Sequence, residues 1–163
     1  MNANREWTLE HLIKGIEGVQ VIGEISRIVK HITLDSRKVI TDSLFVAVKG
    51  TQVDGHQFIP KVIEAGASVI LCEEIPAVVV DHVTYVLVKD STYTMGLISS
   101  AFYGHPSRQL KLIGVTGTNG KTSVATFLFQ LFRGLGYRCG LLSTVQNQIE
   151  DDVIQSTHTT PDA

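Results

Sequence analysis

The stretch LIGVTGTNGKTSVATFLFQLF, residues 112–132, decides how the second half of this chain folds. Its apolar start predicts a strand over 110–116, and the glycines at positions 114, 117 and 120 predict a turn. Lys121 and Thr122 then open a predicted helix over about 120–134. A strand, a glycine-rich turn and a helix in this order bring backbone N–H groups and a helix N-terminus to one point, which is an arrangement that binds phosphate.

The glycine spacing departs from the usual phosphate-binding pattern. That pattern, G-x-x-x-x-G-K-[ST], needs glycine where Val115 stands, and this chain reads G-x-x-G-x-x-G-K-T instead. The chemistry survives the change, because the turn, Lys121 for the terminal phosphates and Thr122 for Mg²⁺ keep their order. The alternative is a plain strand-to-helix turn with an exposed lysine. Three apolar residues of the predicted helix are expected to pack on a sheet: Phe127, Leu128 and Leu131.

The composition indicates a globular protein with an ordinary core. Hydrophobic residues make up 44% and charged residues 18%, and the net charge of −2 excludes a broad basic field for nucleic acid or an anionic membrane. The N-terminus lacks an apolar signal core, and no apolar run is long enough to span a bilayer. Cys72 and Cys139 are expected as reduced core thiols. We expect a soluble cytoplasmic monomer.

Strands and helices alternate through the first hundred residues. Apolar runs predict strands over 28–36, 43–50, 68–74 and 84–90, and helical spacing predicts helices over 6–14, 54–67 and 91–104. This alternation favours an α/β domain with a mixed, largely parallel sheet. His-Pro-Ser at 105–107 marks a break, so we expect one domain over 1–106 and another over 107–163.

The second domain is short for a nucleotide-binding fold. It offers two strands expected to be parallel, the later one over 138–144, with one crossover helix between them. A polar tail follows, with a hairpin turn expected at Glu150–Asp152. Since such folds use about five or more strands, we expect an incomplete P-loop, Rossmann-like domain and interpret the chain as a fragment.

Several motifs resemble one enzyme family. GVTGTNGKTS, residues 114–123, resembles the loop of the Mur ligases, ATP-dependent enzymes that add amino acids to the peptidoglycan precursor. Upstream, TLDSR (33–37), DSLFVAVKG (42–50) and DGHQFIP (54–60) are similar to the uridine-binding domain of the branch that adds the third peptide residue, and TTP (159–161) is similar to a substrate motif. The branch that adds D-Ala-D-Ala is one alternative, and a non-catalytic nucleotide-binding module is another.

The resemblance implies two groups of site residues. Lys121 would neutralise the β- and γ-phosphates as the catalytic residue, and Thr122 would hold Mg²⁺. ATP would contact Gly117, Thr118, Asn119, Gly120, Lys121, Thr122 and Ser123. The UDP-MurNAc-peptide would contact Leu34, Ser36, Thr51, Gln52, Val53, His158, Thr159 and Thr160. Two departures from the family stand out: T-Q-V replaces H-Q-A, which leaves Thr51 and Val53 as backbone contacts, and histidine replaces asparagine at His158.

The implied reaction joins an amino acid to UDP-MurNAc-L-Ala-D-Glu. ATP and Mg²⁺ would activate the D-glutamate carboxylate as an acyl-phosphate, which the incoming amine attacks. The sequence leaves open whether that amine belongs to diaminopimelate or lysine. The family's carbamylated lysine, further metal ligands and amino-acid-binding domain are not in this chain, so we expect no turnover from it alone.

Plainer interpretations stand beside these roles. Asp35–Arg37 could be a turn at the end of a strand with an exposed arginine. His56 is expected as a surface residue at the start of a helix rather than a metal ligand, because no second histidine or cysteine lies at ligand spacing. Glu150–Asp152 is expected as a solvated turn, not a metal site.

Overall fold

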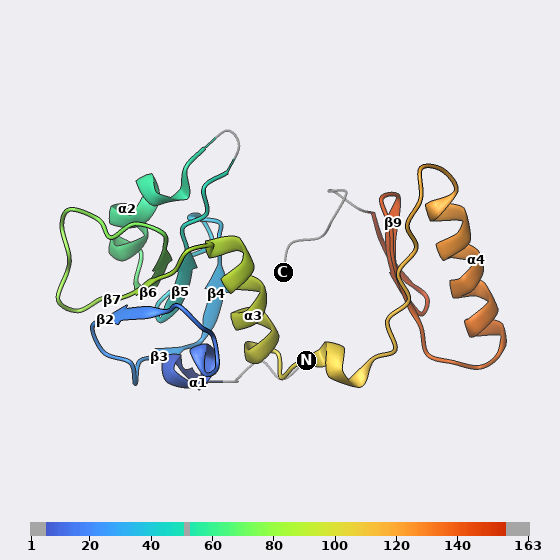
Figure 1. Cartoon of the computed structure of the whole chain (residues 1–163), viewed down its shortest axis with the longest axis horizontal. Helices are drawn as coiled ribbons and strands as arrows, with labels where there is room; N and C mark the ends of the chain where they lie inside the picture. The colour runs from blue at the N-terminus through green and yellow to red at the C-terminus, as the bar shows by residue number, and fades with distance from the viewer. Residues whose placement is uncertain (1–5, 51–52, 156–163) are drawn as a thin grey trace. The chain divides into compact units, whose positions relative to one another are not determined.

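The computed structural model describes residues 6–50 and 53–155, which belong to two compact units that divide between Leu110 and Lys111 (Figure 1). The first unit is built on a five-stranded sheet in the order β2-β7-β6-β5-β4. Strands β4 to β7 run parallel, and β2 pairs antiparallel with β7. The strands are β2 (Gln20–Ile22), β4 (His31–Thr33), β5 (Ser43–Val46), β6 (Ala67–Cys72) and β7 (Thr84–Leu87).

Helices cover both faces of this sheet because its strands are apolar on both sides. Leu44 and Val46 belong to one buried cluster, whereas Phe45 between them belongs to the other, as the two-residue period of a strand requires. The first cluster includes residues of α1 (Leu9–Ile13) and α3 (Ser91–Phe102), and the second includes residues of α2 (Ile59–Glu64). The predicted α/β class with a mixed, mainly parallel sheet is confirmed.

Short elements complete the first unit. Strands β1 (Trp7–Thr8) and β3 (Ile28–Val29) pair antiparallel apart from the main sheet. The Trp7 indole N–H donates to the Phe102 carbonyl at 2.9 Å, which joins the start of the chain to the end of α3. Two 3-10 helices are also present, η1 (Gly55–Phe58) and η2 (Pro106–Gln109).

Several predicted elements differ in extent. The strand expected over 28–36 is broken into β3 and β4, and the helix expected over 54–67 divides into η1 and α2. The helix expected over 6–14 is shorter, because Thr8 is extended and caps α1 by accepting from the His11 N–H at 3.3 Å. Strand β2 was not predicted, since its three residues carry too little pattern.

The described part of the second unit, residues 111–155, contains one helix and a three-stranded antiparallel sheet. Helix α4 (Lys121–Gly134) matches the prediction, and the sheet runs β10-β9-β8. Its strands are β8 (Gly140–Leu142), β9 (Gln146–Ile149) and β10 (Asp152–Gln155). The expected hairpin is present, with its turn at Glu150 and Asp151. Arg133 forms an ion pair with Asp151 and Arg138 forms one with Glu150, both at 2.7 Å.

The prediction of two parallel strands in this unit is wrong. Residues 111–116 form no strand, and β8 pairs antiparallel with β9. A strand exists only where a neighbour completes its hydrogen-bond ladder, and the described residues offer 111–116 no such neighbour. Without such a neighbour, two apolar side chains of this segment are left exposed: Leu112 is 75% exposed and Ile113 is 59% exposed.

Candidate functional site

The glycine-rich loop leads directly into α4. Gly117 and Gly120 have φ angles of 151° and 76°, values that glycine adopts far more easily than other residues. Gly120 is the N-cap of the helix, and no side chain accepts a hydrogen bond from the first turn. The first helical bond runs from the Val124 N–H to the Gly120 carbonyl, so the amides that precede it face the loop free of a capping side chain.

The Lys121 side chain folds back across this loop. Its ammonium donates to the Gly117 carbonyl at 2.6 Å and lies 3.4 Å from the Thr118 carbonyl. These bonds hold a positive charge over the turn, next to the positive end of the helix dipole. A helix N-terminus and an ammonium at one loop form a site for an anion with several oxygens, such as a polyphosphate.

The loop therefore brings together all seven residues predicted to contact ATP: Gly117, Thr118, Asn119, Gly120, Lys121, Thr122 and Ser123. Of these, Thr122 is half-buried in the first turn of α4, and its carbonyl accepts from the Thr126 hydroxyl at 2.8 Å. Its hydroxyl is a suitable ligand for Mg²⁺. Elsewhere in the described ranges, no group of three or more histidine, cysteine or acidic side chains could hold a metal ion.

The apolar face of α4 is exposed within the second unit. Four residues at helical spacing are between 47% and 68% exposed: Val124, Phe127, Leu131 and Leu135. Phe127 and Leu131 thus do not pack on a sheet as expected within the described residues, whereas Phe129 is buried.

The residues predicted to contact uridine follow neighbouring strands of the first unit. Leu34 and Ser36 come after β4, and Val53 lies in the loop after β5. Because β4 and β5 are parallel neighbours, both segments leave the sheet at its carboxyl edge, where ligands of α/β proteins bind. Leu34 and Val53 are 41% and 50% exposed, and Ser36 is half-buried. Thr51, Gln52, His158, Thr159 and Thr160 lie outside the described residues.

An ion pair shapes the turn that carries Ser36. The Arg37 guanidinium donates through Nε and Nη2 to the two carboxylate oxygens of Asp35, at 2.9 and 2.8 Å. The Arg37 N–H also donates to Asp35 at 3.0 Å. These bonds lower the pKa of Asp35 from an ordinary 3.8 to about 2, the side-chain bond from Arg37 being the main cause. The turn is therefore built by its own side chains, and the Arg37 side chain is 82% exposed.

His56 is not the surface residue that the sequence suggested. Its side chain is only 14% exposed, and both ring nitrogens are hydrogen-bonded. Nδ1 lies 2.7 Å from an Asp54 carboxylate oxygen, and Nε2 accepts from the Glu73 N–H at 2.9 Å. Only a weak signal for these hydrogen bonds of His56 is present in the sequence. Asp54, two residues earlier, is a residue type that caps helices, and it is the N-cap of η1.

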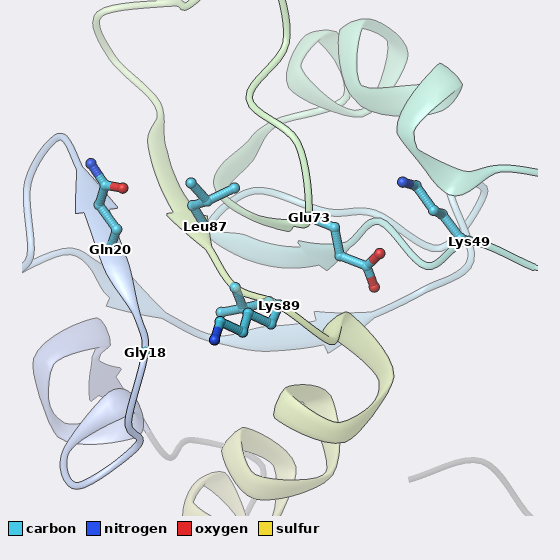
Figure 2. A pocket seen from close by; sticks show the side chains of 7 residues that line it. Gly18, Gln20, Lys49, Glu73, Leu87 and Lys89 are labelled. Atoms are coloured by element: carbon cyan, nitrogen blue, oxygen red, sulfur yellow. The ribbon is translucent and has the colours of Figure 1, made fainter.

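A shallow pocket of about 450 Å³ lies at the carboxyl ends of β6 and β7, beside the start of β2. Figure 2 shows its side chains, among them Gln20, Leu87 and Lys89. Glu73 on its wall accepts from the N–H and hydroxyl of Ser91, both at 2.9 Å, and so holds the start of α3. Lys49 is paired with Glu74 at 2.6 Å.

The two cysteines differ. Cys72 is buried, as predicted, and burial raises the pKa of its thiol to about 11. Cys139 is only partly buried, so the prediction of a core thiol is wrong there for the described residues. No helix in the described part of the chain is long and apolar enough to cross a membrane.

Two family models match the chain: the Mur ligase family catalytic domain over 28–103 and the Mur ligase middle domain over 115–163. The chain is 50% identical over 154 residues to the UDP-N-acetylmuramoyl-L-alanyl-D-glutamate–2,6-diaminopimelate ligase of Bacteroides thetaiotaomicron, covering 94% of this chain and 32% of that protein. It is 51% identical over 156 residues to the ligase of the same name from Cytophaga hutchinsonii, covering 95% and 32%. The chain thus spans about a third of the length of these relatives.

Solved structures show the same fold. A UDP-N-acetylmuramoyl-L-alanyl-D-glutamate–2,6-diaminopimelate ligase superimposes with a TM-score of 0.72 at 23% identity, covering 96% of this chain and 31% of that one. MurF from Acinetobacter baumannii gives 0.61 at 25% identity over 82% and 28%. MurF from Thermotoga maritima, in complex with ADP, gives 0.50 at 31% identity over 64% and 23%. One Mur ligase model matches the first part of the chain and another matches the second part. The chain belongs to the Mur ligase family.

Proposed function

We propose that this chain is the nucleotide-sugar-binding and phosphate-binding part of an ATP-dependent ligase that adds diaminopimelate to UDP-MurNAc-L-Ala-D-Glu. The observation that carries the proposal is the identity of about half over 94–95% of the chain to relatives with that name. Their printed name supplies the amino acid, which the residues of this chain leave open between diaminopimelate and lysine.

ATP is proposed to bind at the loop between 117 and 123. The uncapped N-terminus of α4 and the Lys121 ammonium fit a triphosphate, because both offer positive charge and N–H donors at one place. A bound phosphate would replace the Gly117 carbonyl as the partner of Lys121. Mg²⁺, held by Thr122, would neutralise phosphate charge. The ADP bound by the related Thermotoga maritima MurF supports a nucleotide in this family.

The first domain, predicted over residues 1–106 and contained in the first unit, is proposed to bind the UDP-MurNAc-peptide. Leu34 offers an exposed apolar side chain to a uracil ring, and Ser36 offers a hydroxyl that donates to no residue of the described part of the chain. Val53 lies on the neighbouring loop, and Thr51 and Gln52 precede it. His158, Thr159 and Thr160 are proposed to contact the peptide end of the same substrate.

The proposed reaction moves the γ-phosphate of ATP to the D-glutamate carboxylate. The resulting acyl-phosphate loses phosphate when the amine attacks, which leaves an amide, ADP and phosphate. Lys121 neutralises charge that develops on the phosphates during this transfer. We place the enzyme in the cytoplasm, where ATP and UDP-sugars are made, and propose that it acts as a monomer.

The alternative that the chain belongs to a D-Ala-D-Ala-adding ligase is less well supported. The MurF structures are 25–31% identical, whereas the diaminopimelate ligases are about 50% identical over nearly the whole chain. A non-catalytic nucleotide-binding module would not account for the resemblance of the first unit.

An assay of ADP release by the protein at the full length of its relatives tests the proposal. ADP should appear only when ATP, UDP-MurNAc-L-Ala-D-Glu and diaminopimelate are all present. Lys121→Met should lower kcat by about a hundredfold or more. ADP release that needs lysine or D-Ala-D-Ala in place of diaminopimelate would assign another branch, and release that needs no amine would contradict ligase chemistry.

A further inference from the structure

We propose that His56 is a positioning residue for the nucleotide-sugar site, and that it works only while its ring is neutral. The inference rests on the proposed function, because His56 holds the described base of the loop after β5 at Asp54, and the adjoining Val53 is proposed to meet uridine. Both ring nitrogens of His56 have protein partners, so its proposed action on the ligand is indirect. His56 ties the loop to the end of β6 through one hydrogen bond that protonation of the ring removes.

The loop after β5 is closed tightly at its base. The Gly50 N–H donates to the carbonyls of Val48 and Val53, both at 3.1 Å, and the Gly55 N–H donates to Val48 at 2.8 Å. Lys49 and Asp54 form an antiparallel bridge between these bonds. A Cβ on Gly55 would lie 2.8 Å from the Val48 nitrogen, so the two sides of the loop meet in backbone contact. The described base of the loop, residues 48–50 and 53–55, is therefore held together by backbone contacts.

His56 provides that attachment. The Asp54 carboxylate accepts from the His56 N–H at 2.9 Å and from ring Nδ1 at 2.7 Å, so the histidine is locked to the base of the loop. On the other side of the ring, Nε2 lies 2.9 Å from the nitrogen of Glu73, the first residue after β6. Glu73 in turn holds the N–H and hydroxyl of Ser91 at the start of α3. One imidazole thus connects the loop to β6 and α3.

The partners decide the tautomer. A backbone N–H can only donate, so Nε2 must accept and carry no hydrogen, and Nδ1 carries the hydrogen that it donates to Asp54. Protonation puts a hydrogen on Nε2 and aims it at the Glu73 N–H. The bond to Asp54 survives protonation, and the bond to β6 does not. Acid therefore detaches the loop without breaking the turn that carries His56.

Charged groups surround the ring from the loop and from the segment after β6. They are Asp54 and Lys49 on the loop and Glu73 and Glu74 after β6. The backbone and side chain of His56 lower the pKa of Asp54, and Lys49 lowers the pKa of Glu74 and has its own pKa raised by it. The lowered pKa values of Asp54 and Glu74 and the raised pKa of Lys49 keep these three groups charged between pH 5.5 and 7.5, so they contribute no change of charge in that window.

Calorimetric titration of UDP-MurNAc-L-Ala-D-Glu into the 163-residue chain at pH 7.5 and 5.5 tests the inference. At pH 7.5, His56→Ala and His56→Asn should weaken Kd about fivefold to tenfold, because both lose the acceptor for Glu73. His56→Gln should stay within about threefold of wild type, because its amide oxygen reaches the place of Nε2. From pH 7.5 to 5.5 the wild type should lose affinity by a similar factor, and His56→Gln should not.

A matched control separates the histidine from the ligand's own titration. His82 is exposed and makes no hydrogen bond within the described residues, so His82→Gln should keep the wild-type response to pH. The exchange rate of the Glu73 amide, followed by NMR in the absence of ligand, should rise in His56→Ala and in acid, and not in His82→Gln.

The outcomes separate the two proposals. The inference is wrong, and the proposed function stands, in either of two cases in which the wild type binds. In the first, His56→Ala binds the nucleotide sugar with the same Kd as the wild type. In the second, His56→Gln loses as much affinity between pH 7.5 and 5.5 as the wild type does. If the Glu73 amide loses protection as expected and the wild type binds no nucleotide sugar at all, the proposed function fails and the positioning role fails with it.

Discussion

The two units of this chain differ in how far they bury their apolar side chains. In the first unit, helices bury both faces of the sheet, and β6 is buried along almost its whole length. In the second, Phe129 and Leu141 are buried, while α4 keeps Val124, Phe127 and Leu131 exposed. Exposed apolar stripes of this kind are typical of surfaces that pack against other protein. The first unit is stabilised by its own described residues, and the second is only partly so.

The largest expected effect comes from truncating one apolar side chain in each unit. Leu71 is fully buried in β6, so Leu71→Ala should lower the free energy of unfolding by about 2–5 kcal/mol. Phe127 is 68% exposed, and Phe127→Ala should change it by less than about 0.5 kcal/mol. Urea unfolding of both variants measures the difference. Equal losses would show that α4 is as well packed as the central strand.

The two thiols sharpen the comparison by chemistry. Cys72 is buried with a pKa raised to about 11, and Cys139 is partly exposed. Iodoacetamide at pH 8 should alkylate Cys139 at least about a hundredfold faster than Cys72, because the thiolate is the nucleophile and must be reached. Mass spectrometry of the peptides gives both rates, and denatured protein is the control, in which the rates should converge. Comparable rates in the native protein would contradict the buried environment of β6.

Substitution of Gly120 tests the conformation of the glycine-rich loop before α4. Its φ of 76° strains any residue with a Cβ, although a Cβ there would meet no atom within 4 Å. Gly120→Ala should therefore destabilise the second unit by about 1 kcal/mol through backbone strain alone. Gly114 is the matched control. A Cβ there would also meet no atom within 4 Å, but unlike Gly120 it does not have a left-handed backbone conformation. Thermal unfolding followed by circular dichroism compares them, and an equal change in both would exclude strain at Gly120.

The smallest effect belongs to the turn after β4. Asp35 has a folded pKa of about 2 against an ordinary 3.8, so its contribution to stability is complete above pH 3.8 and is lost as the pH falls through 2. Arg37→Gln should return the pKa of Asp35 toward 3.8 and leave stability at neutral pH almost unchanged, because Arg37 is exposed. NMR titration of the Asp35 carboxyl measures this, and an unchanged pKa would show that Arg37 is not its cause.

Sequence patterns predicted the first unit well because its elements contain their own signals. The strands β5, β6 and β7 are short apolar runs, and Asp90 caps α3 by accepting from the Tyr93 N–H. Patterns failed where structure depends on distant partners. The segment 111–116 has the composition of a strand, but a strand needs a neighbour, and β8 pairs with β9 instead.

The candidate sites divide in the same way. The glycine-rich turn and the start of α4 were predictable from the sequence, because Gly117 and Gly120 mark the turn and Lys121 opens the helix, whereas the roles of these residues in binding ATP stay a prediction. The role of His56 was not predictable, because its partner Glu73 lies 17 residues away and contributes a backbone N–H, which no side-chain pattern reveals.

Calorimetric titration of UDP-MurNAc-L-Ala-D-Glu into this chain, with Ser36→Ala beside it, tests most directly whether the first unit binds the nucleotide sugar. The account predicts saturable binding with one site, weakened about tenfold in Ser36→Ala by the loss of a hydroxyl that meets the ligand. Lys121→Ala should bind nearly as well as the wild type if the uridine end provides the affinity. No heat of binding from a chain whose far-UV circular dichroism shows it folded would contradict the account.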